Sequence, residues 1–326
     1  MYECHSKRLI CDQLAPLVQK RTTKFRTPVP ICKRAMLTLW RLATNIEYRT
    51  LGHLFGVGRG TVCVIFHEII DAINTILQPR YLKFPCALVD NLYEISLMDI
   101  EHIGTFPQCC GAIDSTHISI IAPKEHHTDY YNRKCHHFVI IQGVVDYIYR
   151  FTNINVGHAG KHHDAHVLRE SPLFRKACAG QLLPRWTETI DNTEIPLFLI
   201  GDPAYPLLLW LMKAYSGNHL TAEQRVFNYR ISRARMTVEC AFGRLKGRLR
   251  YLLKRLDNDL PSVSGIVKAC CTLHNICEIH GEYFDENWLD GVVAENAAMP
   301  NVQNHNNGTT DAKAIRSAIT NWLKYN

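Results

Sequence analysis

Residues Gly111–Pro123 read GAIDSTHISIIAP, and here the hydrophobic pattern of the chain changes from helix-like to strand-like. The stretch fits the two-residue period of a β-strand, with Asp114 in its middle. A carboxylate in a core strand is destabilising unless it is paired or binds a metal. Asp114 is therefore the first candidate for a functional side chain.

The segments that follow predict the rest of a sheet. Residues 136–149 (HHFVIIQGVVDYIY) and 150–160 (RFTNINVGHAG) read as two strands whose link is short enough for an antiparallel hairpin. Residues 163–178 turn helical, the apolar run 196–202 (PLFLIGD) suits a central strand buried on both faces, and the chain is helical again from Arg230. This order of elements predicts an α/β fold, with a mixed sheet covered by helices.

The part of the chain before this sheet is predicted to be helical up to about Leu77. Residues 50–73 read as a short helix, a glycine-containing turn and a third helix, which is the helix-turn-helix pattern. We expect Arg59 and Thr61, near the start of the last helix, to contact DNA. The exposed side of that helix offers few side chains that read bases, so a trihelical bundle used for protein contacts fits nearly as well.

Composition restricts the class of protein. The 326 residues are 47% hydrophobic, as in ordinary soluble globular proteins, and the start MYECHSKRLI lacks the apolar run of a signal peptide. Thirteen cysteines without such a signal favour a reducing compartment. The most apolar run, Ile195–Met212, contains Asp202 and three prolines, so we expect no membrane span.

Basic residues concentrate in one segment. Between Arg230 and Arg255 there are nine Lys or Arg residues and one acid, although the formal net charge of the whole chain is only +7. Nucleic acid is the first partner to consider for such a segment, and a solvated basic helix is the alternative. The candidates for DNA contacts in this segment are Arg244, Lys246, Arg248 and Arg250.

Three acids stand out by position. Asp114 lies in its strand, Asp202 follows the predicted central strand at its carboxyl end, and Glu239 is the one acid of the basic helix. Carboxylates beside a basic surface suit Mg²⁺, which prefers oxygen ligands and keeps water and substrate phosphate in its shell. Two such ions would cleave a phosphodiester by activating a water and stabilising the leaving oxygen. The alternative is a separate salt bridge for each acid, with Arg235 pairing Glu239.

A family resemblance supports the first of these readings. Six stretches, in this order and spacing, resemble the DDE endonuclease of PIF/Harbinger transposases and the Harbinger transposase-derived nucleases: GAIDSTHISIIAP, YYNRKCHHFVIIQGVVD, HHDAHVL, GDPAYPL, TVECAFGRLKGRLR and CCTLHNICE. The resemblance covers roughly residues 9–283. It implies an RNase H-like mixed sheet flanked by helices, preceded by a helical helix-turn-helix region. The carboxylates of that sheet would hold a divalent metal, Mg²⁺ or Mn²⁺, for DNA hydrolysis and strand transfer.

Carried over by position, the resemblance assigns metal-binding roles to four carboxylates. Asp114 matches the acid of GAID, Asp164 that of HD, Asp202 that of GD and Glu239 that of VE. Asp114, Asp202 and Glu239 would be the catalytic residues. In this family a separate Myb-like protein commonly serves target recognition and nuclear entry. The resemblance therefore implies such a partner and a nuclear location, with a cytoplasmic pool if import depends on the partner.

The chain departs from the family beside three of the acids. Pro203 and Ala204 follow Asp202 where Ser-Gly is common, His162 stands where a small residue usually precedes HD, and Cys240 replaces a basic residue after the helix glutamate. These departures remove no ligand. They change the surroundings of the site, on which turnover depends.

Crowded histidines around Asp164 raise zinc as an alternative. The motif GHAGKHHDAHVL (Gly157–Leu168) contains four histidines, of which two can share a helix face. Nitrogen ligands favour zinc, whereas Mg²⁺ and Mn²⁺ suit carboxylate and water. We predict that Asp164 begins a helix after the third strand and faces the other acids as a fourth carboxylate. The histidines of the zinc alternative are His158, His162, His163 and His166.

We therefore expect three regions along the chain. Residues 1–80 form a helical region with the helix-turn-helix, residues 107–283 the RNase H-like nuclease domain, and residues 284–326 an Asn-rich link with a C-terminal helix. The expected function is a divalent-metal-dependent DNA endonuclease. The alternative is a domesticated DNA- or chromatin-binding protein whose nuclease fold is catalytically silent. Either could act as a homo-oligomer.

Overall fold

The computed structural model describes residues 5–24, 27–84, 106–125, 127–131, 136–290, 292 and 308–325. The chain divides into two compact units, each assembled from three chain segments. Unit 1 consists of Met1–Lys83, Ile118–Val139 and Gly243–Ala297; unit 2 consists of Phe84–His117, Ile140–Phe242 and Ala298–Asn326. The contiguous regions predicted from the sequence divide the chain differently, and they stay a prediction.

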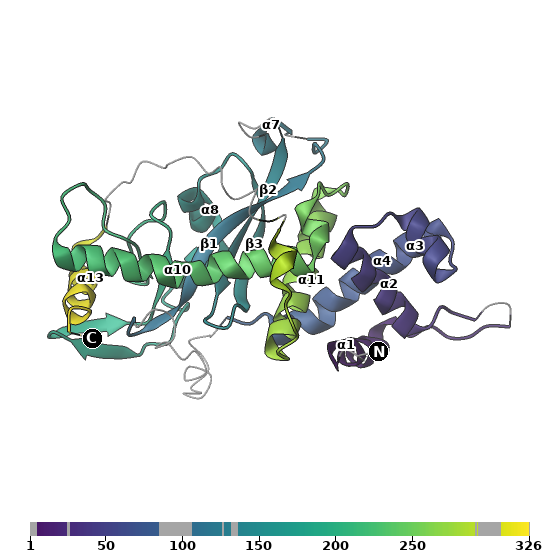
Figure 1. Cartoon of the computed structure of the whole chain (residues 1–326), viewed down its shortest axis with the longest axis horizontal. Coiled ribbons are helices and arrows are strands. Elements are labelled where there is room, and N and C mark those ends of the chain that lie inside the picture. Colours follow the sequence, from purple (N-terminus) through teal and green to yellow (C-terminus); the bar gives the residue numbers. More distant parts are fainter. Residues whose placement is uncertain are drawn as a thin grey trace. The chain divides into compact units, whose positions relative to one another are not determined.

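Unit 2 is built around a five-stranded mixed sheet (Figure 1). Strand β6 pairs in parallel with β1 and with β7, whereas β2 and β3 are joined by the tight turn Asp146–Arg150, which is long enough only for antiparallel strands. The predicted mixed sheet is confirmed, and the run predicted as its central strand forms β6, which is buried and lies between β1 and β7. The strand order is β3 (Phe151–Ala159), β2 (His137–Val145), β1 (Cys109–Ile120), β6 (Phe198–Gly201) and β7 (Leu211–Met212).

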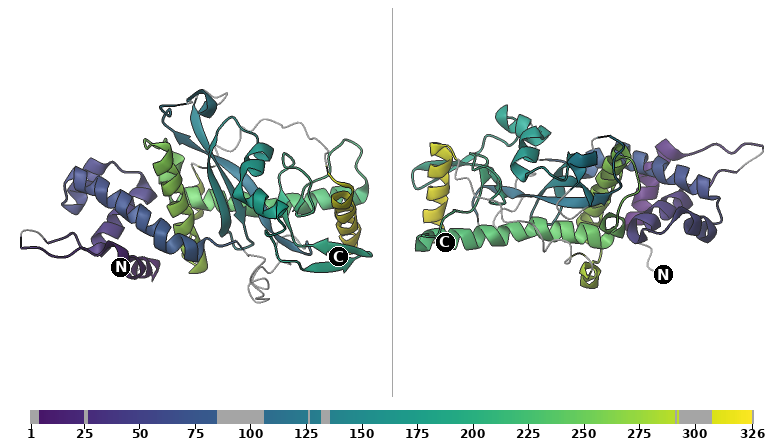
Figure 2. Two further views of the ribbon diagram at one scale, coloured as in Figure 1. Left: turned by 180° about the vertical axis from the view of Figure 1, so that it is seen from behind. Right: turned by 90° about the horizontal axis from the view of Figure 1, so that it is seen from above.

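Each face of this sheet has its own hydrophobic core, because successive strand residues point to opposite faces. Phe198 and Ile200 of β6 pack with residues of α10 (Ala222–Arg248) and α13 (Thr310–Trp322). Leu199, between them, packs on the other face with residues of α8 (Asp164–Glu170) and α9 (Pro172–Cys178). Helices thus cover both faces, as the view from above shows (Figure 2). This layered arrangement matches the predicted RNase H-like architecture.

A bulge in β1 decides which face Asp114 reaches. Cys109 lies in the core beneath α10 and Cys110 in the core beneath α8. The pairing with β6 shifts between Cys109 and Ala112, where Gly111 adopts a φ of 149°. A Cβ atom on Gly111 would lie 2.5 Å from the carbonyl oxygen of Val145, so this position requires glycine. Beyond the bulge, Ile113 joins the α8 side, and the next residue, Asp114, faces α10.

Two short parts of unit 2 were not predicted from the sequence. Strands β4 (Thr187–Ile190) and β5 (Thr193–Pro196) form a hairpin whose two turn residues, Asp191 and Asn192, have φ angles of 49° and 59°. Such a turn matches the twist of paired strands. Strand β7 is only two residues long.

The predicted C-terminal helix is present as α13, and its buried face joins the core beneath α10. Its first turn is capped by the Thr309 hydroxyl, which accepts a hydrogen bond from the N–H of Ala312. The link expected before it falls mostly on residues 291 and 293–307, which lie outside the described residues.

Unit 1 is mainly helical, and α3, a turn and α4 form the predicted helix-turn-helix. The turn contains Gly56, whose φ of 59° is favourable for glycine, and its N–H caps α3. The apolar stripe of α4 is buried as predicted, including Val62, Phe66 and Ile69. The helical elements of this unit are α1 (His5–Val18), α2 (Ile31–Thr44), α3 (Tyr48–Phe55), α4 (Arg59–Ala72), η1 (Ile73–Leu77), α5 (Gln78–Tyr81), α7 (His127–Tyr130), η3 (Arg250–Leu253), α11 (Leu260–Ile279) and η4 (Glu286–Leu289).

One helical run of unit 1, Arg59–Tyr81, is long and apolar enough to cross a membrane by length and composition alone. Many of its apolar side chains are buried within the fold, among them Ile65, Ile70 and Leu77. A core helix passes the same test of length and composition, so the run carries no functional conclusion.

Candidate active site

The register of two strands brings the first two acids together. Strand β1 pairs in parallel with β6, and Ile113 lies opposite Gly201. The next residue along β1 is Asp114. The next residue after Gly201 is Asp202, which directly follows the end of β6. The two carboxylates therefore lie at the carboxyl end of β6. Ligand sites of open α/β sheets are found at the carboxyl ends of their strands.

Backbone groups orient both carboxylates in the same way. The N–H of Ser115 donates to Oδ1 of Asp114 over 2.8 Å, and the N–H of Ala204 donates to Oδ1 of Asp202 over 2.6 Å. The Oδ2 atoms remain available for a cation. Both approach the same nitrogen, Nη2 of Arg235, at 3.4 Å and 3.3 Å.

Helix α10 supplies that cation and the third acid. Arg235 and Glu239 are four residues apart, so they lie on one face of the helix, and Nη2 of Arg235 lies 3.0 Å from Oε1 of Glu239. One guanidinium nitrogen thus contacts three carboxylates. The side chain of Arg235 is 17% exposed and that of Glu239 is 53% exposed, so the cluster runs from the sheet out to the surface.

Asp164 belongs to the same cluster. It is the first residue of α8, which begins shortly after β3 as predicted. Burial raises the pKa of Asp164, a hydrogen bond with the Ser115 side chain opposes this rise, and the nearby charge of Asp202 adds to it. Because Asp164 and Asp202 interact through their charges, the structure brings all four predicted acids into one neighbourhood.

The electrostatics of Asp114 reflect this crowding. Burial raises its pKa to about 7, while Arg235 and the N–H of Ser115 oppose the rise. The charges of Asp164 and Asp202 raise the pKa further. Carboxylates in such a place favour a proton or a cation, because full ionisation of all of them leaves like charges close together.

A buried set of hydroxyl and amide groups lies behind Asp164. The hydroxyl groups of Ser115 and Tyr205 are 3.1 Å apart, and Nε2 of Gln142 donates to the Tyr205 hydroxyl over 3.1 Å. Tyr205 is fully buried, and burial raises the pKa of its hydroxyl well above the usual value, so it stays protonated. The three residues form a chain of hydrogen bonds that ends at Asp164.

Sequence reasoning missed this chain, although two signals were present. Gln142 is an isolated polar residue in the apolar run of β2, and a buried amide of this kind needs a partner. The second signal is the position of Tyr205, which follows the predicted metal ligand Asp202 by only three residues in GDPAYPL.

The donor set fits a hard divalent cation. All four acids offer carboxylate oxygens, which Mg²⁺ and Mn²⁺ prefer. Within the described ranges, no group of three or more His, Cys, Asp or Glu side chains is arranged to hold a metal directly. The guanidinium of Arg235 lies among the carboxylates instead. A divalent ion held by Asp114, Asp202 and Glu239 would therefore take over contacts that Arg235 now makes.

The neighbouring histidines pack against one another. The rings of His162 and His166 have centroids 4.5 Å apart, and those of His158 and His162 are 6.5 Å apart. Nδ2 of Asn155 lies 2.9 Å from Nε2 of His158, and burial lowers the pKa of His158. That Asp164 rather than His158, His162, His163 and His166 binds the metal stays a prediction.

Three of the predicted DNA-binding residues are engaged within unit 1. The guanidinium groups of Arg244 and Arg248 both donate to Glu278, over 2.8 Å and 2.6 Å, and both stack on the Phe284 ring. Lys246 is 2% exposed. The charges of Arg244 and Arg248 are therefore part of the packing of unit 1, and DNA binding by the three residues stays a prediction.

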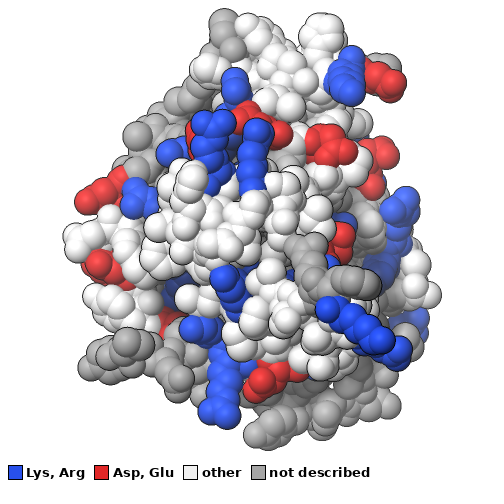
Figure 3. Space-filling view, turned by 90° about the vertical axis from the view of Figure 1, so that its right-hand side faces the viewer, with Lys and Arg blue, Asp and Glu red and all other residues white. Residues whose placement is uncertain are grey.

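The other three, Arg59, Thr61 and Arg250, reach the surface. Arg59 is the first residue of α4 and Arg250 the first of η3, and both are exposed, whereas Thr61 is half-buried. Lys and Arg side chains occur as separate groups on the face shown in Figure 3.

Two models of known protein families match parts of the chain. Residues 113–275 match the family described as DDE superfamily endonuclease, and residues 28–79 match the helix-turn-helix of DDE superfamily endonuclease. No solved structure matches the chain.

Three curated relatives are similar over most of the chain. "Protein Antagonist of like heterochromatin protein 1" from Arabidopsis thaliana is 31% identical over 257 residues, which are 78% of this chain and 64% of the relative. "Protein ALP1-like" from Arabidopsis thaliana is 30% identical over 260 residues, 76% of this chain and 61% of the relative. "Putative nuclease HARBI1" from Homo sapiens is 26% identical over 248 residues, 73% of this chain and 65% of the relative.

The chain spans a little under two thirds of the length of these relatives. The endonuclease match alone covers half of the chain, and it contains all four acids of the cluster. The chain therefore belongs to the DDE superfamily endonucleases, in the Harbinger-derived family.

Proposed function

We propose that this protein is a divalent-metal-dependent endonuclease that hydrolyses phosphodiester bonds of DNA. The observation that carries the proposal is the convergence of carboxylates from separate elements on one cation. Asp114 comes from β1, Asp202 from the end of β6 and Glu239 from α10, and all three contact Arg235. Separate salt bridges would give each acid its own partner, so the shared cation supports a common site.

In this proposal the four acids hold Mg²⁺ or Mn²⁺ together. When bound, the divalent ions activate a water and stabilise the leaving oxygen of the phosphodiester. Asp114 and Asp202 present their Oδ2 atoms, since Oδ1 of each is held by a backbone N–H. Asp164, oriented through Ser115 and Tyr205, completes the set of acids.

Arg235 has a distinct role in the same proposal. Its guanidinium balances the charge of the carboxylates while no metal is bound, which keeps the cluster together at neutral pH. Metal binding then requires the guanidinium to leave the Oδ2 atoms. A displaced guanidinium beside the site is suited to a phosphate oxygen of the substrate.

A nuclear location and a separate Myb-like partner for target recognition belong to the same proposal. The exposed side of α4 supports the need for a partner: Val64 is 62% exposed, and Glu68 is occupied by ion pairs with Lys20 and Arg34. Few side chains are left there to read bases. Imaging of the tagged chain with and without a co-expressed partner tests both parts.

The test of the endonuclease is the conversion of supercoiled plasmid to nicked circles by the purified chain. We expect nicking with Mn²⁺ or Mg²⁺ and none with EDTA. DNA binding without nicking under any divalent metal would instead favour the catalytically silent DNA-binding protein.

A further inference from the structure

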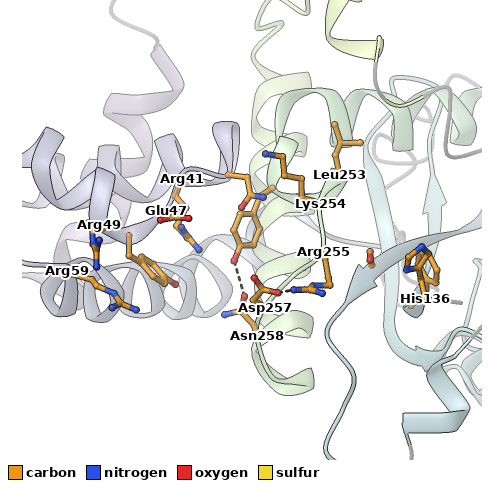
Figure 4. A pocket seen from close by; sticks show the side chains of 15 residues that line it. Arg41, Glu47, Arg49, Arg59, His136, Leu253, Lys254, Arg255, Asp257 and Asn258 are labelled. Carbon is orange, nitrogen blue, oxygen red and sulfur yellow. Dashed lines mark hydrogen bonds and ion pairs between the residues drawn. The ribbon is translucent and has the colours of Figure 1, made fainter.

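Unit 1 contains a cleft with a volume of about 1030 Å³ (Figure 4). One wall comes from the helix-turn-helix region, with Arg49 of α3 and Arg59 of α4. The other comes from the segment after α10, with Lys254 and Arg255, and from His136 before β2. The cleft thus combines the helix-turn-helix with chain segments that lie far away in the sequence, since Lys254 follows Arg59 by 195 residues and His136 follows it by 77.

The cleft has an excess of positive charge. Five Lys or Arg residues and two acids line it. Two of the five are engaged: Arg41 is 9% exposed and stacks on the Tyr48 ring at 3.7 Å, and Arg255 pairs with Asp257 at 3.0 Å. The Arg255 pair is exposed on both sides, so it is weak and open to competition.

Three cations of the cleft remain free. Arg49, Arg59 and Lys254 are exposed, and within the part of the chain that the structure describes they have neither an ion pair nor a hydrogen bond. Three unpaired cations from three different segments converge on one hollow. Such an arrangement lowers the free energy of an anion in the cleft.

Size and lining narrow the class of ligand. A single phosphate fills only a small part of 1030 Å³, so the cleft has room for several anionic groups at once. This cleft adds uncharged hydrogen-bonding side chains to its cations, among them Asn45 and Ser119. The lining therefore suits an extended polyanion whose charges are spaced along a backbone.

The position of the cations identifies the polyanion. In helix-turn-helix proteins the second helix enters the major groove by its N-terminal end, and the preceding helix crosses the DNA backbone. Arg59 is the first residue of that second helix, and Arg49 lies in the helix before it. We infer that the cleft binds the phosphodiester backbone of duplex DNA without reading its sequence, an inference that rests on the proposed function for its choice of DNA.

The test is fluorescence anisotropy of the full chain with duplexes of unrelated sequence, at several KCl concentrations. We expect Arg49→Gln/Arg59→Gln/Lys254→Gln to weaken binding to every duplex alike, by roughly tenfold or more at low salt. The slope of log affinity against log salt should decrease by about three. A variant that keeps the charges, Arg49→Lys/Arg59→Lys/Lys254→Arg, should bind nearly as the wild type does.

A matched control removes the same charge elsewhere on unit 1. Arg8, Lys24 and Lys83 are exposed and do not line the cleft, so Arg8→Gln/Lys24→Gln/Lys83→Gln should leave the salt slope unchanged. An equal loss of affinity in both triple variants overturns the inference, since only net charge would then matter. Equally strong competition by poly-glutamate and by duplex DNA also overturns it.

The outcome is independent of the nuclease proposal. Binding is measured with EDTA present, so it requires no metal and no cleavage. Loss of binding in the cleft variant without nicking by the wild type leaves the cleft established and the endonuclease contradicted. Nicking by the wild type with unchanged binding by the cleft variant supports the endonuclease and contradicts the cleft.

Discussion

Asp114 and Asp202 lie side by side because β1 and β6 pair in parallel with Ile113 opposite Gly201. One oxygen of each acid accepts a hydrogen bond from a backbone N–H, and the other oxygen faces Arg235. The sheet thus orients both carboxylates. The guanidinium of Arg235 between them is the group that a bound metal would replace.

Substitution of Arg235 should separate its effect on stability from its competition with the metal. We expect Arg235→Gln to lower the free energy of unfolding of the metal-free protein by about 1–3 kcal/mol, because three carboxylates lose a shared charged donor. Mn²⁺ should bind this variant more tightly, since no guanidinium has to be displaced. Denaturant unfolding and Mn²⁺ titration calorimetry measure the two effects.

Arg233→Gln is the matched control, because Arg233 is exposed on the same helix and its guanidinium lies near the Tyr229 ring. Its stability should stay within about 0.5 kcal/mol of the wild type. Unchanged Mn²⁺ affinity in Arg235→Gln would show that the guanidinium does not compete with the metal.

Removal of the buried Tyr205 hydroxyl should lower the affinity of the site for metal. Tyr205→Phe breaks the hydrogen-bond chain from Gln142 through Ser115 to Asp164, so Asp164 loses its fixed orientation. We expect Mn²⁺ affinity to fall by about 10–100-fold, as for other groups that orient metal ligands. Calorimetric titration with Mn²⁺ measures the change.

Tyr215→Phe provides the comparison. Tyr215 also shares a hydroxyl hydrogen bond, at 2.9 Å, but its partner is Thr320 of α13 and not a group that orients an acid of the site. Both variants should lose about 1 kcal/mol of stability. An equal loss of Mn²⁺ affinity in both would mean that Tyr205 acts only through general stability.

Metal binding should depend on pH through Asp114. Burial raises the pKa of Asp114 to about 7, against the opposing charge of Arg235 and with the charges of Asp164 and Asp202 adding to the rise. A metal must displace this proton, so Mn²⁺ affinity should increase from pH 6 to pH 8. Titrations in buffers of different ionisation enthalpy measure the released protons.

The stability of the metal-free protein should change in the opposite direction. The unfolded chain releases the proton of Asp114 near its ordinary pKa of 3.8, whereas the folded chain keeps it up to about pH 7. The free energy of unfolding therefore falls between about pH 4 and pH 7 on account of this group. Asp114→Asn should reduce that decline, and an unchanged pH profile would contradict the raised pKa.

The basic helix should respond to substitution through stability. Arg248 and Glu278 are 6% and 8% exposed and 2.6 Å apart, and Arg244 shares the same carboxylate. We expect Glu278→Gln to cost about 3–5 kcal/mol, because it leaves two guanidinium groups without their counter-ion. Chemical denaturation measures this cost, with the exposed Arg250→Gln as a control that should change stability little.

The main strands and the layers of the fold were predictable from the sequence, because β1, β2, β3 and β6 carry strong periodic or apolar patterns. Strands β4 and β5 were missed because each is only four residues long, and β4 is also mostly exposed. Their Asp191-Asn192 turn was the better signal, since both residues tolerate a positive φ.

The four acids were predictable by position and by family resemblance, whereas their shared partner was not. The spacing of Arg235 and Glu239 predicts one pair on a helix, but contact with Asp114 and Asp202 depends on how α10 packs across the sheet. Glu278 shows the same limit. It lies 30 residues beyond Arg248 on another helix, so the sequence indicated a charged surface where the structure has an internal ion pair.

The most direct test of the metal site is Mn²⁺-dependent plasmid nicking by Asp114→Asn, Asp202→Asn and Glu239→Gln, measured beside the wild type and Glu194→Gln, which removes an exposed acid of β5. We predict that each of the three cluster variants folds and loses nicking, whereas Glu194→Gln nicks at the wild-type rate. A double variant should be no slower than the single ones, because the acids act as a unit. Nicking at the wild-type rate by any of the three would contradict the proposed site.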